Sequence, residues 1–118
     1  MNRSECRKAI IAHLPVGSWM RATELRAYIA HELDTDDVPL SIFSLMNDRA
    51  RLAALDVPSI WKIWRELRRM QKEGLVVSRR TTRYRLNLPV GYVREWKLQR
   101  VCQKRMVLET PPRYSVVQ

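Results

Sequence analysis

The side chains of this sequence that could take part in chemistry are mostly cations. Lys and Arg number 22 against 12 Asp and Glu, which gives a formal net charge of +10. Residues 1–58 hold 7 basic and 8 acidic side chains, whereas residues 59–118 hold 15 and 4. A surface with this bias attracts polyanions by neutralising phosphates and releasing counterions. Nucleic acid is therefore the expected partner; an acidic protein, an anionic lipid or a merely solvated basic face are the alternatives.

The sequence offers no catalytic constellation. His13 lies on an expected helical apolar stripe and His31 is flanked by helix formers, so both are interpreted as structural histidines. Three glycines form no phosphate-binding loop, and no nucleophile has an adjacent base. Asp34, Asp36 and Asp37 suggest a calcium loop, but the required glycine and the later glutamate are missing. We therefore expect a protein that is not an enzyme and that has no cofactor and no metal site.

The cations are concentrated in one stretch, residues 59–88. Ser59 follows a proline and can cap a helix that continues to Gly74. At about 100° per residue, this helix has one face suited to a core and an opposite face suited to solvent or a ligand. The core face comprises Ile60, Ile63, Trp64, Leu67, Met70, Gln71 and Gly74. The opposite face comprises Trp61, Lys62, Arg65, Arg68, Arg69 and Lys72.

A basic β-hairpin is predicted directly after this helix. Residues 75–77 are apolar and mostly β-branched, as is typical of a strand. The turn is predicted at residues 79–82 and the return strand at residues 83–86. Alternation along that return strand would point Tyr84 and Leu86 toward the core and its arginines outward.

This order of elements resembles the winged helix-turn-helix domains of bacterial regulators such as the MarR-like and ArsR-like families. The resemblance is carried by the Ser59 cap, by Leu67 and Met70, by residues 72–76 (Lys-Glu-Gly-Leu-Val), and by the arginine-rich hairpin after them. It covers residues 4–88. It implies a mainly α fold with a small β-hairpin (α+β), in which the helix from Ser59 is the recognition helix and the hairpin is the wing.

The preceding segments fit the same pattern. Ser4 opens a first helix, which ends at Pro15. The apolar couplet at residues 19–20 matches the small first strand that winged helices lay beside the wing. Thr23 can cap a helix over residues 24–33, which would be the first helix of the helix-turn-helix.

Two segments depart from the family pattern. Residues 34–57 separate the two helices where a turn of a few residues would suffice, and they predict an extra inserted helix. Residues 89–118 carry too many large apolar side chains for a disordered arm, so an ordered C-terminal extension is predicted. We expect a helix over residues 92–108, packed on the core or on a second subunit. The predicted organisation is thus one domain over residues 1–88 followed by this extension.

The resemblance also implies which residues contact DNA. Exposed residues of the recognition helix enter the major groove, and wing residues touch the backbone or the minor groove. Arg65 and Arg69 best match the two acceptors of a guanine edge, whereas Arg68 and Lys72 are assigned to phosphate. Trp61 packs on a sugar or a thymine methyl, or is covered by the insertion or a partner. The candidate set is Ser59, Trp61, Lys62, Arg65, Arg68, Arg69, Lys72, Arg79, Arg80 and Arg83.

The expected function is sequence-specific binding of double-stranded DNA, as a regulator of transcription or replication control of bacterial, plasmid or phage type. A homodimer is expected because one recognition helix makes few base contacts. A cytoplasmic, nucleoid-associated protein is expected because no apolar run approaches the roughly 20 residues of a membrane span. Cys6 and Cys102 are interpreted as reduced thiols. The alternative is a winged-helix protein-interaction module in a DNA-associated assembly, with an acidic partner.

Overall fold

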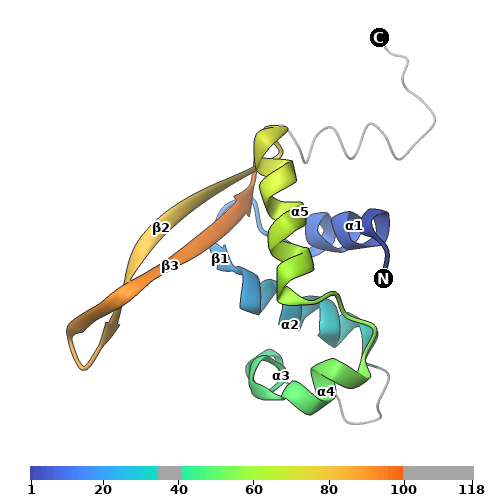
Figure 1. The fold of residues 1–118 in the computed structure, drawn as a ribbon, viewed down its shortest axis with the longest axis horizontal. Coiled ribbons are helices and arrows are strands. Elements are labelled where there is room, and N and C mark those ends of the chain that lie inside the picture. Colours follow the sequence, from blue (N-terminus) through green and yellow to red (C-terminus); the bar gives the residue numbers. More distant parts are fainter. Residues whose placement is uncertain (35–40, 100–118) are drawn as a thin grey trace.

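The computed structural model describes residues 1–34 and 41–99. Over these ranges the fold is α+β, with five helices and one antiparallel sheet of three strands (Figure 1). The predicted α+β class is confirmed, whereas the hairpin, predicted to be small, has strands of ten and eleven residues. The chain forms, in order, α1 (Arg3–His13), β1 (Met20–Arg21), α2 (Ala22–Leu33), α3 (Ile42–Asn47), α4 (Arg49–Ala54), α5 (Ile60–Lys72), β2 (Val76–Arg85) and β3 (Leu88–Leu98).

The first two helices begin slightly earlier than predicted. In α1, Asn2 is the N-cap; its side chain accepts a hydrogen bond from the Glu5 amide at 2.8 Å, and the Glu5 carboxylate accepts one from the Asn2 amide at 3.0 Å. Thr23 was predicted to cap α2, and this prediction is wrong. Arg21 occupies the cap position, and the Glu24 carboxylate accepts a hydrogen bond from its amide at 3.4 Å.

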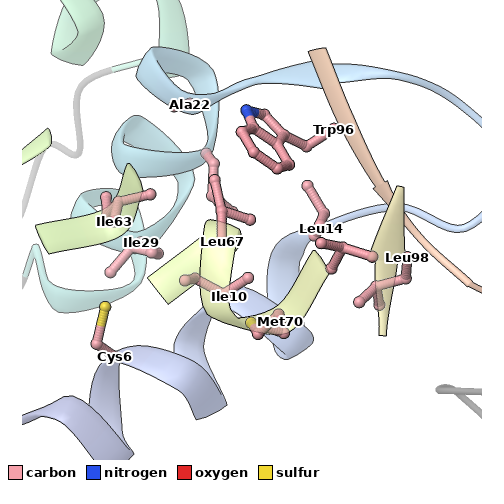
Figure 2. Packing of buried hydrophobic residues seen from close by; sticks show 12 residues of the cluster. Cys6, Ile10, Leu14, Ala22, Ile29, Ile63, Leu67, Met70, Trp96 and Leu98 are labelled. Carbon is pink, nitrogen blue, oxygen red and sulfur yellow. The ribbon is translucent and has the colours of Figure 1, made fainter. Parts of the chain in front are cut away.

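The main core lies between α1, α2, α5 and the base of the sheet. Ile63, Leu67 and Met70 of α5 are fully buried, which confirms the centre of its predicted core face, whereas Gln71 is exposed. Figure 2 shows these side chains converging with residues of α1, α2 and β3. The cluster contains Cys6, Ile10, Leu14, Ala22, Leu25, Ile29, Ile63, Leu67, Met70, Val76, Trp96 and Leu98.

α3 and α4 are two short helices that pack on α2. Leu45 of α3 and Leu52 of α4 are buried against Ala27 and Ala30, whose small side chains allow the helices to approach closely. Two helices therefore lie where one extra helix was predicted; that they are an insertion into a winged helix stays a prediction. Residues 35–40, which include part of the acidic segment, lie outside the described residues.

The hairpin is longer than the sequence predicted, and its turn lies elsewhere. β2 continues through residues 79–82, so the predicted turn there is wrong. The chain reverses at Leu86 and Asn87, with φ of 52° and 65°. Asn adopts positive φ more readily than other non-glycine residues, and two such residues in succession give the type I′ turn that matches the twist of a hairpin. Tyr84 and Leu86, predicted to face the core, are exposed.

The return strand replaces the start of the predicted C-terminal helix. Residues 92–98 belong to β3, so the helix predicted to begin there is wrong over that range. β3 is the central strand: it pairs with β2 from Val76↔Leu98 to Arg85↔Leu88, and with β1 at Met20↔Trp96. The predicted boundary at residue 88 therefore falls at the first residue of this strand. Residues 100–118, the rest of the predicted extension, lie outside the described residues.

We expect Leu86→Asn to stabilise the protein by about 1 kcal/mol. A left-handed conformation at a leucine costs roughly this much because its Cβ approaches the following carbonyl, and asparagine tolerates it better. The side chain loses little packing because Leu86 is 90% exposed. Urea denaturation measures the change, with the exposed strand residue Leu88→Asn as the control that gains nothing. A less stable Leu86→Asn protein would refute the strain argument.

Candidate functional site

The start of α5 is fixed by its cap and by α2. The Ser59 hydroxyl accepts a hydrogen bond from the Lys62 amide at 3.2 Å, as predicted. The Arg26 guanidinium of α2 donates to the Pro58 carbonyl at 3.0 Å, and partial burial lowers the pKa of Arg26. Pro58 is buried and accepts this hydrogen bond, so the residue before the cap of α5 is fixed to α2.

One side of α5 is closed by residues of α1. Glu66 is only 1% exposed and accepts hydrogen bonds from Arg3 at 3.2 Å, Arg7 at 2.5 Å and Arg69 at 3.1 Å. Burial would raise the pKa of Glu66, but the hydrogen bonds from Arg7 and Arg69 hold it below its ordinary value. Arg69, a predicted base contact, is thus engaged in an internal ion-pair network.

The same side of α5 also holds Lys62 and Glu73. The Lys62 ammonium donates to the Met1 carbonyl and is half-buried. Arg7 donates two hydrogen bonds to the Glu73 carboxylate, at 2.9 and 2.7 Å, which lower the pKa of Glu73. Residues from the N-terminus therefore occupy the side of the helix that carries Lys62, Glu66, Arg69 and Glu73.

Glu66→Gln should destabilise the fold by about 2 kcal/mol at pH 7, because it removes the buried carboxylate that pairs with Arg3, Arg7 and Arg69 while these partly exposed arginines keep access to solvent. The pKa of Glu66 is depressed in the folded state, so its contribution is complete above about pH 4.5 and is lost as pH falls through the folded pKa. Urea denaturation of wild type and variant at several pH values should show the difference shrinking in acid. Glu24→Gln, which keeps a cap acceptor, is the control. A gap between wild type and Glu66→Gln that is constant with pH would contradict this assignment.

The other polar side of α5 is open. Trp61, Arg65, Arg68 and Lys72 recur at helical spacing and are all exposed. Among residues 1–34 and 41–99, none of the three cations makes an ion pair. We call these four residues the free face of α5. Every other charged side chain of the helix lies on the α1 side.

A groove of about 580 Å³ runs along the free face. Ile60, Trp61 and Trp64 give it apolar walls, and Arg65 and Arg68 supply cations at its edge. Trp61 is 75% exposed, which is unusual for so large an apolar side chain. The groove can therefore make van der Waals contacts and charge-assisted hydrogen bonds with the same ligand.

The hairpin lies beside this free face. Gln71 donates a hydrogen bond to the Ser78 hydroxyl at 3.1 Å, and the rings of Trp64 and Trp96 meet edge to face with centroids 5.4 Å apart. Around the helix, Trp64 and Gln71 lie next to the Trp61 and Arg68 positions. The base of the hairpin and the free face of α5 therefore form adjoining surfaces.

The hairpin face toward α5 carries two opposed arginines. Arg80 and Arg94 are directly paired across β2 and β3. Arg94 donates to the Ser78 hydroxyl at 3.0 Å, and the Arg80 guanidinium lies 4.8 Å from the ring centroid of Tyr92. The sequence has no Asp or Glu between Glu73 and Glu95. Like charges directly opposite each other destabilise a sheet, so this pair is suited to an anion bound between them.

The opposite face of the hairpin carries an ion pair and two cation–π contacts. Arg79 donates to Glu95 at 2.8 Å and lies 4.6 Å from the ring centroid of Trp19. Lys97 lies over the same ring, at 4.5 Å. Arg79, although predicted as a wing contact, is thus paired and faces away from α5.

The predicted site is therefore brought together only in part. Trp61, Arg65, Arg68, Lys72 and Arg80 lie on adjoining surfaces, whereas Lys62, Arg69 and Arg79 face elsewhere and Ser59 caps the helix. Arg83 lies farther out on the hairpin and is exposed.

Two residues of this surface were missed by the sequence prediction: Tyr92 and Arg94. Residues 92–98 contain a tyrosine, a valine and a tryptophan, which are typical of a strand. They do not alternate strictly between apolar and charged residues, so the pattern did not separate a strand from a helix.

Comparison of the chain with protein-family models, curated proteins and solved structures gives no significant match.

Proposed function

We propose that this chain binds double-stranded DNA sequence-specifically, as a winged helix-turn-helix regulator of transcription or replication control. One observation carries the proposal: the free face of α5 and the adjoining hairpin face are basic and hold no carboxylate. The acidic residues of the described chain from residue 59 onward are Glu66, Glu73 and Glu95, and each is paired with arginine elsewhere. Arg65, Arg68, Lys72, Arg80 and Arg94 make no ion pair among the described residues and lie on this surface, where they can neutralise phosphates of a polyanion.

The order of elements supports this proposal. A helix, a short strand, four further helices and a hairpin follow one another, and β1 lies beside β3 as expected for a winged helix. In this interpretation α2 and α5 are the helix-turn-helix, with α3 and α4 inserted between them. The insertion packs on α2 through the Leu45 cluster and leaves the free face of α5 open.

The proposed roles follow from the geometry. Arg65 and Arg68 project from the free face, and a guanidinium matches the two acceptors of a guanine edge in the major groove. Arg80 and Arg94 bind backbone phosphate, which relieves the repulsion between them. Lys72, in the last helical turn, also contacts phosphate. Homodimerisation on paired half-sites and a nucleoid location belong to the same proposal.

The test is a fluorescence-anisotropy titration of a labelled mixed-sequence duplex at about 50 and 200 mM salt. Neutralising several phosphates should lower the affinity about a hundredfold between the two conditions. Absence of binding at the lower salt, or binding indifferent to salt, would contradict the proposal.

The second candidate function is a protein-interaction module with an acidic partner. It is favoured by the apolar groove and by the exposed Trp61. The same titration separates the two, because such a module would not bind duplex DNA at low salt. Within the described residues, no helix has the length and apolar character needed to cross a membrane.

A further inference from the structure

The distal half of the hairpin exposes a group of large apolar side chains. Figure 1 shows this end of β2 and β3 projecting away from the helices. No other described element packs over it. The exposed residues are Tyr84, Leu86, Leu88, Val90 and Tyr92.

Leu86 at the turn is unfavourable in two ways for an isolated protein. Its side chain is almost completely exposed, and its φ of 52° is a conformation that leucine adopts rarely. The position suits asparagine or glycine, and nothing in the described chain gains a contact from leucine there. An outlier of this kind points to a role outside the folding of the chain.

The charges around the tip indicate which class of partner it can bind. Arg83 and Arg85 precede Leu86, both are exposed, and neither makes an ion pair among the residues that the structure describes. A second copy of the tip would bring two more arginines against them, with no carboxylate to compensate. A nucleic acid instead offers phosphates on both sides of an apolar stack of bases.

The hairpin is also long enough to reach such a target. The five residues of β2 from Thr81 to Arg85, at about 3.3 Å each, give an arm of roughly 17 Å beyond the part of the hairpin that adjoins α5. The minor groove next to a helix bound in the major groove lies about half a turn away, or roughly 17 Å. A shift in strand register between Arg83 and Tyr84 alters the twist of the arm just before the tip.

We propose that the hairpin tip enters the minor groove and inserts Leu86 between base pairs as an apolar wedge, so that the protein bends DNA. Apolar wedges of this type partly unstack a base step and kink the duplex toward the major groove. Arg83 and Arg85 hold the flanking phosphates, and Tyr84 lines the sugars beside the wedge. This inference rests on the proposed DNA-binding function.

The experiment measures bending and binding separately. A duplex of about 30 base pairs, selected from a random pool with the wild-type protein and carrying a donor and an acceptor dye at its ends, reports the bend by energy transfer. Its anisotropy reports the affinity. Wild type should bend the duplex by about 20° or more. Leu86→Asn should lose at least half of that bend while its affinity falls less than about tenfold.

The choice of asparagine makes the test specific. Asparagine suits positive φ, so the hairpin of the variant should be at least as well formed as in wild type. Leu88→Asn, which removes an exposed leucine two residues away, should keep most of the bend. If Leu86 mattered only for the turn, Leu86→Asn would bend DNA as well as wild type does, and the wedge would be overturned.

The remaining outcomes are distinguishable. If wild type does not bind the duplex at low salt, the proposed function and the wedge both fail. If wild type binds without bending, only the wedge fails. If wild type sediments with phosphatidylserine vesicles and Leu86→Asn does not, the tip binds a lipid surface. If wild type is a dimer in analytical ultracentrifugation and Leu86→Asn is a monomer, the tip binds a second copy of the chain. Either result overturns the wedge.

Discussion

Replacing Arg65 and Arg68 together by alanine is expected to lower the affinity for a selected duplex about a hundredfold or more. Both arginines lie on the free face of α5, and neither is held by a carboxylate in the described chain. Each bidentate contact to a guanine contributes about 1–3 kcal/mol, so two of them account for a loss of this size. Fluorescence anisotropy on the selected duplex measures it.

The matched control removes two positive charges from other places. Lys8 of α1 and Arg49 of α4 are exposed and lie off the proposed surface. Their double alanine variant has the same net charge as the Arg65/Arg68 variant but should lose less than about tenfold. Equal losses in the two variants would mean that total charge, and not this surface, drives binding.

Replacing Trp96 by alanine is expected to destabilise the fold by about 4 kcal/mol, close to the whole stability of a small domain. Trp96 is 1% exposed, lies on the central strand and contacts Trp64 of α5. Its removal leaves a cavity where the sheet meets the helices (Figure 2). Trp96→Phe, which keeps an aromatic ring, should lose less.

Trp61→Ala is the control for this prediction, because it removes the same kind of side chain from the surface. Its stability should change by no more than about 0.5 kcal/mol, since Trp61 is 75% exposed. Urea denaturation of the two variants gives the comparison. A larger loss for Trp61→Ala than for Trp96→Ala would mean that α5 is rotated or that β3 does not form.

α5 could be predicted from sequence because its signals are local. A serine cap, apolar residues three and four apart, and a glycine at the end all lie within sixteen residues. Ser59 does cap the helix, and Gly74 has φ of +80°. The pattern gave the buried side correctly at Ile63, Leu67 and Met70.

The hairpin could not be placed as well, because its register depends on pairing with a distant strand. Four polar residues, 79–82, look like a turn when read alone, but Thr81 and Thr82 are β-branched and continue the strand. At the observed turn, Asn87 is the one residue whose type favours a turn. Exposure of the apolar tip also breaks the alternation rule that pointed Leu86 inward.

The sequence predicted which types of residue form the site better than it predicted which way their side chains point. Helical periodicity cannot separate Arg65 from Arg69, because both are polar positions on the same half of α5. Their fates differ because Glu66, Arg3 and Arg7 form a network around Arg69, and the two α1 residues are about sixty positions away in sequence. Such ion pairs appear only once the helices are packed.

The most direct test of the proposed interface is to follow backbone amide resonances by NMR while duplex DNA is added at low salt. The account predicts that shifts concentrate along α5 from Trp61 to Lys72 and along residues 78–94 of the hairpin. Amides of α3 and α4, which pack on α2 away from this surface, should remain unchanged. Shifts confined to α1, α3 or α4, or no shifts at all at saturating DNA, would contradict it.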